Sequence, residues 1–247
     1  MTAYESLSVS YDGLTRDIDY SRILAFLEAV LEGQGLRPKS VLDLACGTGS
    51  MSLLLAQRGY EVLGADISEE MLTVAAQKAA KLSENPPYFI CQPMQRLRLP
   101  RPVDAVFCLL DSINYLTRPE DCRKTFQRVF AALQSGGVFL FDINTPAKLE
   151  SLDGQVFLDE NEESYCVWRA DFDFEKRLCY YGIDLFQKKG RLWERSFEQH
   201  CEYAYAPQEL VLWLREAGFG RVESYGDCRM EAPAAQEHRI YFAAYKE

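Results

Sequence analysis

Between residues 41 and 143 the chain alternates short apolar runs with segments of helical periodicity, and this alternation constrains the fold more than any other feature. The apolar runs are four to eight residues long, as buried strands are, and lie at 41–45, 61–66, 88–91, 103–110 and 138–141. We predict helices between them, one ending at Arg58, one beginning after Ser68 and one spanning 120–133. Such alternation is typical of a mostly parallel sheet with helices on both faces. The ligand of such a sheet lies beyond the carboxyl ends of its strands.

Between residues 149 and 205 the pattern changes to an alternation with period two, which predicts an antiparallel β unit inserted into the core. The alternating segments are 165–167, 172–174, 181–185 and 192–205, with a turn at 188–190. A last helix (207–217) and two strands (221–225 and 238–245) complete an α/β fold with a doubly wound, mostly parallel, seven-stranded sheet. The predicted parts are an N-terminal helical cap (1–37), a core (38–148 and 206–247) and the insertion (149–205).

A glycine-rich turn closes the first predicted strand, in the sequence Asp43-Leu-Ala-Cys-Gly-Thr-Gly49. Glycines let the backbone approach a ligand closely at the start of a helix. Asp66 ends the second strand, 19 residues beyond Gly47, where a carboxylate can hold both hydroxyls of a ribose. This spacing suits any dinucleotide or nucleoside site of the architecture.

The negative charge of Asp43, beside the glycine-rich turn, distinguishes between two classes of cofactor. A nicotinamide fingerprint requires G-x-G-x-x-G, but Ser52 occupies the sixth position counted from Gly47. Asp43 adds a carboxylate, which is costly in an apolar strand unless it has a partner and which would repel a pyrophosphate. The same carboxylate attracts the α-ammonium and sulfonium groups of S-adenosylmethionine, so the sequence favours the methyl donor.

Four segments resemble the motifs of the class I, Rossmann-like S-adenosylmethionine-dependent methyltransferases, in particular bacterial small-molecule enzymes with an antiparallel insertion. The segments are 41–50, 65–71, 104–115 and 133–142. The resemblance covers about residues 38–145, and the end of the last helix at 217–219 extends it. It implies a methyltransferase whose cofactor is S-adenosylmethionine.

The resemblance also implies roles for individual residues around the donor. The residues expected around its methionine part are Asp43, Ala45, Gly47, Gly49, Cys108 and Leu109. Asp66 would bind the ribose, and Ile67 and Met94 would pack on the adenine. Relatives often carry an acidic residue after the third strand that reads the adenine amino group. Pro93 stands there in this chain, which leaves Gln92 or Gln95 for that role.

Four residues are candidates on the acceptor side: His200, Tyr11, Asp111 and Tyr115. The alternation of the insertion aims His200 either at the cleft or at solvent. Tyr11, with Tyr4 and Tyr20, belongs to a segment that often covers the donor in the family, and helix packing explains it equally well. Asp111 and Tyr115 follow the fourth strand, where the methyl group points, and they either contact the acceptor or cap and pack a helix.

Methyl transfer from a sulfonium is a direct displacement, so an enzyme needs mainly to align the reacting atoms. A general base is needed only where the acceptor loses a proton. Three other functions stay open: a nicotinamide-dependent oxidoreductase, a transferase with a modified donor, and a non-catalytic donor-binding or regulatory protein. Asp43 and Ser52 disfavour the first, and the second needs a cationic group near the transferred unit.

Composition bears on partners and location. The formal net charge is −10, and the densest basic stretch, 188–191, reads as a hairpin turn, so we expect no nucleic-acid partner. The eight cysteines form no C-x-x-C pair, which predicts neither a metal site nor a disulfide framework. No basic-then-apolar leader and no apolar run of ~18 residues is present, so we expect a cytoplasmic protein without membrane contact. The insertion would recognise a small-molecule acceptor or form a homodimer.

Overall fold

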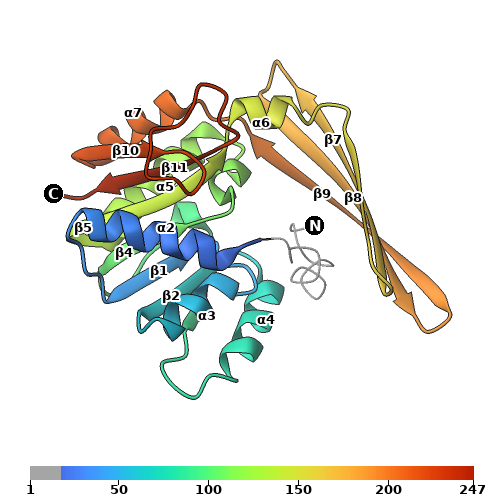
Figure 1. Ribbon diagram of the computed structural model, residues 1–247, viewed down its shortest axis with the longest axis horizontal. Helices are drawn as coiled ribbons and strands as arrows, with labels where there is room; N and C mark the ends of the chain where they lie inside the picture. Colours follow the sequence, from blue (N-terminus) through green and yellow to red (C-terminus); the bar gives the residue numbers. More distant parts are fainter. Residues whose placement is uncertain (1–17) are drawn as a thin grey trace.

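The computed structural model describes residues 18–247 (Figure 1). Its core is a seven-stranded sheet of order β10-β11-β5-β4-β1-β2-β3. The strands are β1 (Ser40–Leu44), β2 (Glu61–Asp66), β3 (Tyr88–Cys91), β4 (Val103–Cys108), β5 (Leu133–Asn144), β10 (Arg221–Tyr225) and β11 (Arg239–Tyr245). Pairing is parallel except where β11 meets β5 and β10. The predicted α/β fold with a mostly parallel, seven-stranded sheet is confirmed.

Helices cover both faces of this sheet because successive strand residues point to opposite sides. The helices are α2 (Tyr20–Gly33), α3 (Ser50–Gln57), α4 (Glu69–Ala79), α5 (Pro119–Ala132) and α7 (Pro207–Ala217). Leu42 and Val106 pack in one hydrophobic cluster with α5 and α7. Val41 and Ala105 pack in a second cluster with α2 and α3. Two short 3₁₀ helices, η1 (Met94–Arg96) and η2 (Ser112–Tyr115), follow β3 and β4.

The insertion forms a separate antiparallel sheet of order β6-β7-β8-β9, preceded by the short helix α6 (Pro146–Glu150). Its strands are β6 (Val156–Glu160), β7 (Ser164–Asp173), β8 (Leu178–Lys189) and β9 (Leu192–Tyr203). Figure 1 shows the long β8–β9 hairpin projecting from the core. The antiparallel insertion is confirmed, but the sequence analysis missed β6, whose five residues are all exposed and show no alternation.

Two boundaries differ from the prediction for local reasons. β4 ends at Cys108 instead of residue 110, because Leu110 and Asp111 adopt the left-handed φ values 56° and 54°. β5 begins at Leu133 instead of residue 138, and so includes Gly136 and Gly137. Gly136 has φ 79°, and the β4–β5 register shifts near this point, so the glycines form an irregularity within the strand rather than a stop before it.

The predicted cap falls partly outside the described residues. Tyr11 lies there, together with Tyr4, while α2 occupies the rest of the segment and packs on the sheet. Within residues 18–247, no helix is both long enough and apolar enough to cross a membrane.

Candidate functional site

A cavity of about 330 Å³ opens at the carboxyl ends of β1, β2 and β4. The sequence-predicted residues that line it are Asp43, Ala45, Gly47, Asp66, Ile67, Met94, Leu109 and Tyr115. Tyr20, at the start of α2, lines it as well. Gly49, Cys108, Asp111 and His200 are not part of its lining. The sheet therefore gathers most of the predicted donor residues around one space, as expected for the carboxyl edge of parallel strands.

The glycine-rich turn owes its shape to left-handed backbone at three positions. Ala45, Gly47 and Gly49 have φ values of 61°, 52° and 77°. Gly49 is the N-cap of α3, and a Cβ there would come within 2.9 Å of the Ala75 side chain. Gly49 is thus required for the packing of α3 against α4, whereas Gly47 faces open space in the cavity.

Asp66 is held in a fixed orientation at the end of β2. Its two carboxylate oxygens accept hydrogen bonds from the backbone N–H groups of Gly47 (2.8 Å) and Ser68 (2.9 Å). Burial raises the pKa of Asp66, and these backbone donors oppose the shift. A pre-oriented carboxylate at the lip of the cavity, beside the 58% exposed Ile67, suits a ribose with an adjoining base.

Asp43 lies at the other side of the turn and is only 3% exposed. Burial raises its pKa to about 6; hydrogen bonds from Ser52 oppose the shift, and the charge of Asp66 adds to it. No basic side chain of residues 18–247 forms an ion pair with Asp43, so its charge lacks a cationic partner among these residues. An α-ammonium group supplies one, and the donor set therefore fits S-adenosylmethionine.

Two glutamines follow β3, and both line the cavity, but their side chains differ in how they are held. The Gln92 side chain is committed to the loop: its Oε1 accepts from the backbone N–H of Arg98 (2.9 Å), and its Nε2 donates to the Arg98 carbonyl (3.3 Å). Gln95 also lines the cavity. Met94 faces the cavity, and the fully buried Cys108 lies behind it, with its Sγ 3.7 Å from the Met94 sulfur. Cys108 thus supports a lining residue instead of lining the site.

On the acceptor side, Tyr115 connects the cavity with the insertion. Its Oη lies 3.2 Å from Nδ1 of His200, a residue of β9 that is 2% exposed. Nε2 of His200 lies 3.0 Å from Oε2 of Glu198. The alternation had left open whether His200 points to the cleft or to solvent, and the structure turns it inward behind Tyr115. Sequence analysis missed Glu198, which shares a face of β9 with His200 because the two are two residues apart.

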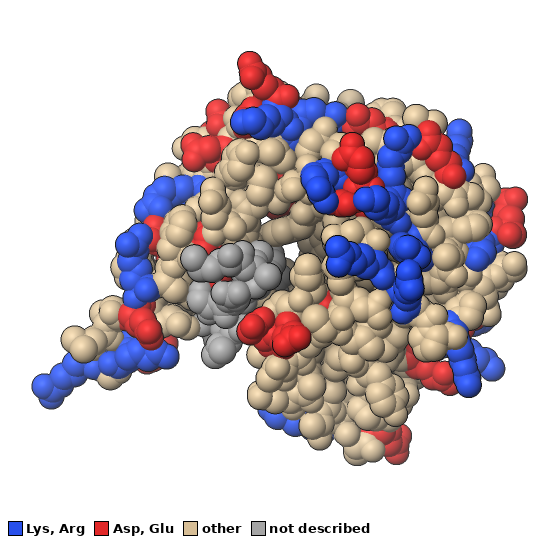
Figure 2. All heavy atoms as spheres, turned by 180° about the vertical axis from the view of Figure 1, so that it is seen from behind, with Lys and Arg blue, Asp and Glu red and all other residues tan. Residues whose placement is uncertain are grey.

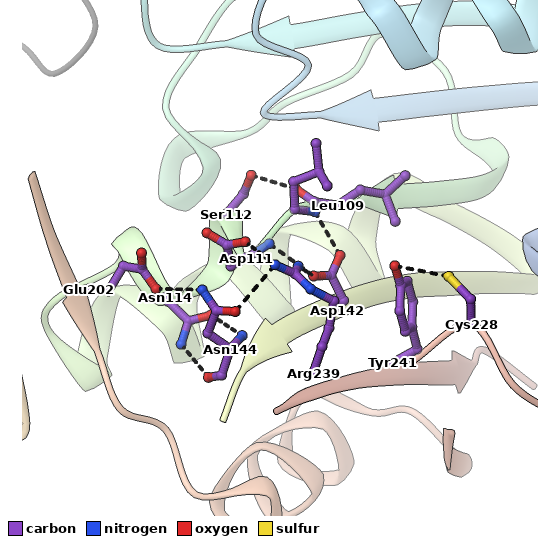
Figure 3. Close-up of polar contacts among 11 residues, drawn as sticks. Leu109, Asp111, Ser112, Asn114, Asp142, Asn144, Glu202, Cys228, Arg239 and Tyr241 are labelled. Atoms are coloured by element: carbon purple, nitrogen blue, oxygen red, sulfur yellow. Dashed lines mark hydrogen bonds and ion pairs between the residues drawn. The ribbon is translucent and has the colours of Figure 1, made fainter. Parts of the chain in front are cut away.

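Asp111 is turned away from the cavity into a buried polar network (Figure 3). Its carboxylate pairs with Arg239 at 2.7 Å. Arg239 also pairs with the fully buried Asp142, whose oxygens accept from the backbone N–H groups of Leu110 (2.7 Å) and Asp111 (3.0 Å). The network fixes the left-handed turn after β4, and the Asp111 carboxylate is part of it.

The same network continues to the insertion. Asn114 donates to the carbonyls of Asn144 (2.9 Å) and Tyr203 (3.0 Å), and Asn144 donates to Glu202 (3.1 Å). Burial and the charge of Asp111 raise the pKa of Glu202 to about 8. Sequence analysis missed Asp142, although an acid in the apolar run of β5 is the signal that identified Asp43.

Comparisons with known proteins agree with this site. Residues 41–137 match the family described as "Methyltransferase domain". YqeM of Bacillus subtilis (strain 168), which is named only as a methyltransferase, is 32% identical over 98% of this chain and 97% of its own length. The glycine/sarcosine N-methyltransferase of Aphanothece halophytica is 34% identical over 76% of this chain and 69% of that protein.

Among solved structures, an S-adenosylmethionine-dependent methyltransferase from Clostridium acetobutylicum ATCC 824 superposes with a TM-score of 0.88. It is 29% identical and the match covers 99% of both chains. The fold, the two carboxylates at the ends of β1 and β2 and the full-length relatives lead to one assignment. The chain belongs to the class I S-adenosylmethionine-dependent methyltransferases.

Proposed function

We propose that this enzyme transfers the methyl group of S-adenosylmethionine to a small-molecule acceptor by direct displacement. The observation that carries the proposal is one cavity in which Asp43 and Asp66 lie at the ends of β1 and β2 and Tyr115 follows β4. The two acids suit the charged and hydroxylated parts of the donor, which leaves Tyr115 for the acceptor. Bound S-adenosylmethionine supplies an electrophilic methyl group on a sulfonium centre.

The donor residues act by binding and orientation. Asp66, fixed by two backbone N–H groups, holds the ribose, and Asp43, held by Ser52, pairs with the α-ammonium group. Ile67 and Met94 pack on the adenine, and Gln95 reads its edge. Positioning of this kind can supply about 7–11 kcal/mol of the barrier when the reacting atoms are aligned.

Tyr115, His200 and Glu198 orient the acceptor and remove a proton where it carries one. The Glu198 carboxylate favours the tautomer of His200 in which Nε2 carries the proton, because Nε2 faces Glu198. Nδ1 then accepts a hydrogen bond from the hydroxyl of Tyr115. As the acceptor attacks with its own electron pair, its proton moves to the Tyr115 oxygen and the hydroxyl proton of Tyr115 moves to Nδ1 of His200.

One of the relatives supports a small acceptor. The Aphanothece relative is named for glycine and sarcosine, which are small amines. An amine acceptor also has a proton to lose, which suits a base behind Tyr115.

Calorimetry with S-adenosylhomocysteine, together with transfer of a labelled methyl group, tests the proposal. Asp66→Ala should weaken binding by about 1.5–3 kcal/mol, the range for hydrogen bonds to a charged group, while Glu84→Ala, an exposed acid outside the cavity lining, should leave it unchanged. Incubation with a cell extract should label the low-molecular-weight fraction. Binding without labelling of any fraction would favour the non-catalytic alternative, and label confined to protein or nucleic acid would exclude a small acceptor.

A further inference from the structure

Seven basic side chains lie close together on the core, although the whole chain has a formal net charge of −10. They come from η1 with the loop after it and from α5 with its N-cap. We call them the arginine surface: Arg96, Arg98, Arg101, Arg118, Arg123, Lys124 and Arg128. All seven are exposed, and the same two stretches contain only two acids, Glu120 and Asp121. Figure 2 shows Lys and Arg side chains gathered beside a hollow in this face.

The fold creates this surface by bringing two separate stretches together. η1 packs against α5, and Leu97 is buried in the same cluster as Phe126 and Val129 of α5. Lys124 and Arg128 are four residues apart and so share one flank of α5. The sequence analysis expected no nucleic-acid partner from the net charge of −10 and from the densest basic stretch, 188–191. A count along the chain does not detect basic residues that meet only in the fold.

Acidic neighbours neutralise only part of the arginine surface. Arg118 and Lys124 pair with Asp121 at 2.5 and 3.6 Å, and Arg123 pairs with Glu216 of α7 at 2.6 Å. The other four members are Arg96, Arg98, Arg101 and Arg128, and none of them forms an ion pair with any residue of 18–247. Their charge is therefore not neutralised by the described part of the chain.

The loop that carries three of the arginines is held in place before any partner arrives. The Gln92 side chain spans the loop with its two hydrogen bonds to the backbone of Arg98. The backbone N–H of Arg96 donates to the Pro93 carbonyl at 2.9 Å, and that of Leu97 donates to the Met94 carbonyl at 3.2 Å. Because the backbone is already ordered, a partner would lose little of its binding free energy to ordering the loop.

The arginine surface begins at the rim of the cavity. Gln95, which lines the cavity, directly precedes Arg96. Leu116, which also lines it, is two residues before Arg118. From there α5 carries the surface about 15 Å to Arg128, at 1.5 Å per residue. A linear polyanion lying along α5 would therefore have one end beside the cavity.

From these observations we propose that the arginine surface binds the phosphate backbone of single-stranded nucleic acid. Six of its seven members are arginines, whose guanidinium groups bind phosphate with two parallel hydrogen bonds. A membrane fits less well, because the two stretches that carry the arginine surface, 94–101 and 118–132, contain no exposed large apolar side chain. The strip is about one helix wide, which suits a single strand. The inference goes beyond the proposed methyl transfer and leaves the acceptor in the cavity unassigned.

Fluorescence anisotropy with a labelled oligouridine, and with an oligothymidine of equal length, tests the proposal. The logarithm of the association constant should fall with the logarithm of salt concentration with a slope of about −3 to −5, for four to seven phosphate contacts. A triple variant, Arg98→Glu, Arg101→Glu and Arg128→Glu, should bind at least roughly tenfold more weakly, with a slope shallower by about 2. S-adenosylhomocysteine binding should be unchanged in it, since these side chains do not line the cavity.

A second triple variant carries the same change of charge elsewhere: Lys188→Glu, Lys189→Glu and Arg191→Glu, at the β8–β9 hairpin. It should bind oligouridine and oligothymidine as the native protein does. If both triple variants lose the same affinity for the oligonucleotides, overall charge explains the effect and the proposal is wrong. The proposal is also wrong if the native protein binds neither oligonucleotide at about 50 mM salt. It is equally wrong if the protein binds phosphatidylserine vesicles or polyglutamate more tightly than it binds both oligonucleotides. Absence of S-adenosylhomocysteine binding by the native protein would instead refute the proposed function.

Discussion

Donor binding should weaken as the pH falls from 7 to 5, because Asp43 becomes protonated in this range. Burial raises the pKa of Asp43 to about 6, so the carboxylate that faces the α-ammonium group loses its charge on acidification. The α-ammonium group stays protonated throughout, since its ordinary pKa is about 7.7–8.0. The change in affinity therefore reports the protein carboxylate and not the ligand.

The magnitude follows from the fraction of ionised Asp43. At about pH 5, one unit below the pKa, roughly a tenth of the carboxylates carry charge. If only that form binds well, the Kd for S-adenosylhomocysteine should rise roughly tenfold above its value at neutral pH, or about 1.4 kcal/mol. Isothermal titration calorimetry at about pH 5, 6 and 7 measures it, with circular dichroism to show that the protein stays folded.

Two variants assign the effect to its residue. Asp43→Asn should bind more weakly at neutral pH and lose most of the pH dependence. Ser52→Ala removes the hydroxyl that donates to Asp43 and lowers its pKa, while the backbone hydrogen bond from position 52 stays, so the midpoint should move to higher pH. A native Kd that is constant between about pH 5 and 7 would refute the reasoning. A full pH dependence in Asp43→Asn would point to Asp66, whose pKa burial also raises.

Three further predictions concern stability and the acceptor side. Asp43→Asn should raise the free energy of unfolding of the ligand-free protein at pH 7 by up to about 3 kcal/mol. The pKa of Asp43 is raised from 3.8 to about 6 in the folded state, so the ionisation of Asp43 destabilises the native state as the pH rises. Urea unfolding should show this gain shrinking as the pH falls towards 4. Arg239→Met should cost about 3–5 kcal/mol by the same assay, because it leaves the buried Asp142 without its cation; an unchanged midpoint would contradict that pairing. In the neutral form of His200, nitrogen NMR should find the ring hydrogen on Nε2. Glu198→Gln should shift this tautomer, and the exposed Glu194→Gln should not.

The core and the donor side could be predicted from the sequence because their signals are local. β2, β3, β10 and α7 have the predicted bounds, since each is an apolar or amphipathic run with clear ends. Asp43 and Asp66 were recognisable for the same reason, because each ends a strand beside a glycine turn or a helix start. The parallel sheet then brings them to one edge.

The acceptor side and the arginine surface depend on contacts between distant residues. Asp111 could not be placed from its neighbours, because its partner Arg239 is 128 positions away. Nothing near Tyr115 in the sequence indicates that His200, 85 positions on, lies against it. β6 is exposed at every position, so pairing with β7, and not a hydrophobic pattern, makes it a strand.

Asp43 and Asp142 are two aspartates in similar surroundings, but one faces a ligand cavity and the other stabilises the fold. Both are buried acids within apolar strands of the parallel sheet, and burial raises the pKa of both. Asp142 receives two backbone N–H groups and the guanidinium of Arg239, so its charge is compensated inside the protein. Asp43 receives hydrogen bonds from Ser52 and faces the cavity without a cationic partner among residues 18–247. An uncompensated charge of this kind destabilises the protein without ligand and strengthens the binding of a cation. The ligand site is therefore distinguished less by the burial of its carboxylate than by the lack of a cationic side chain paired with it among the described residues.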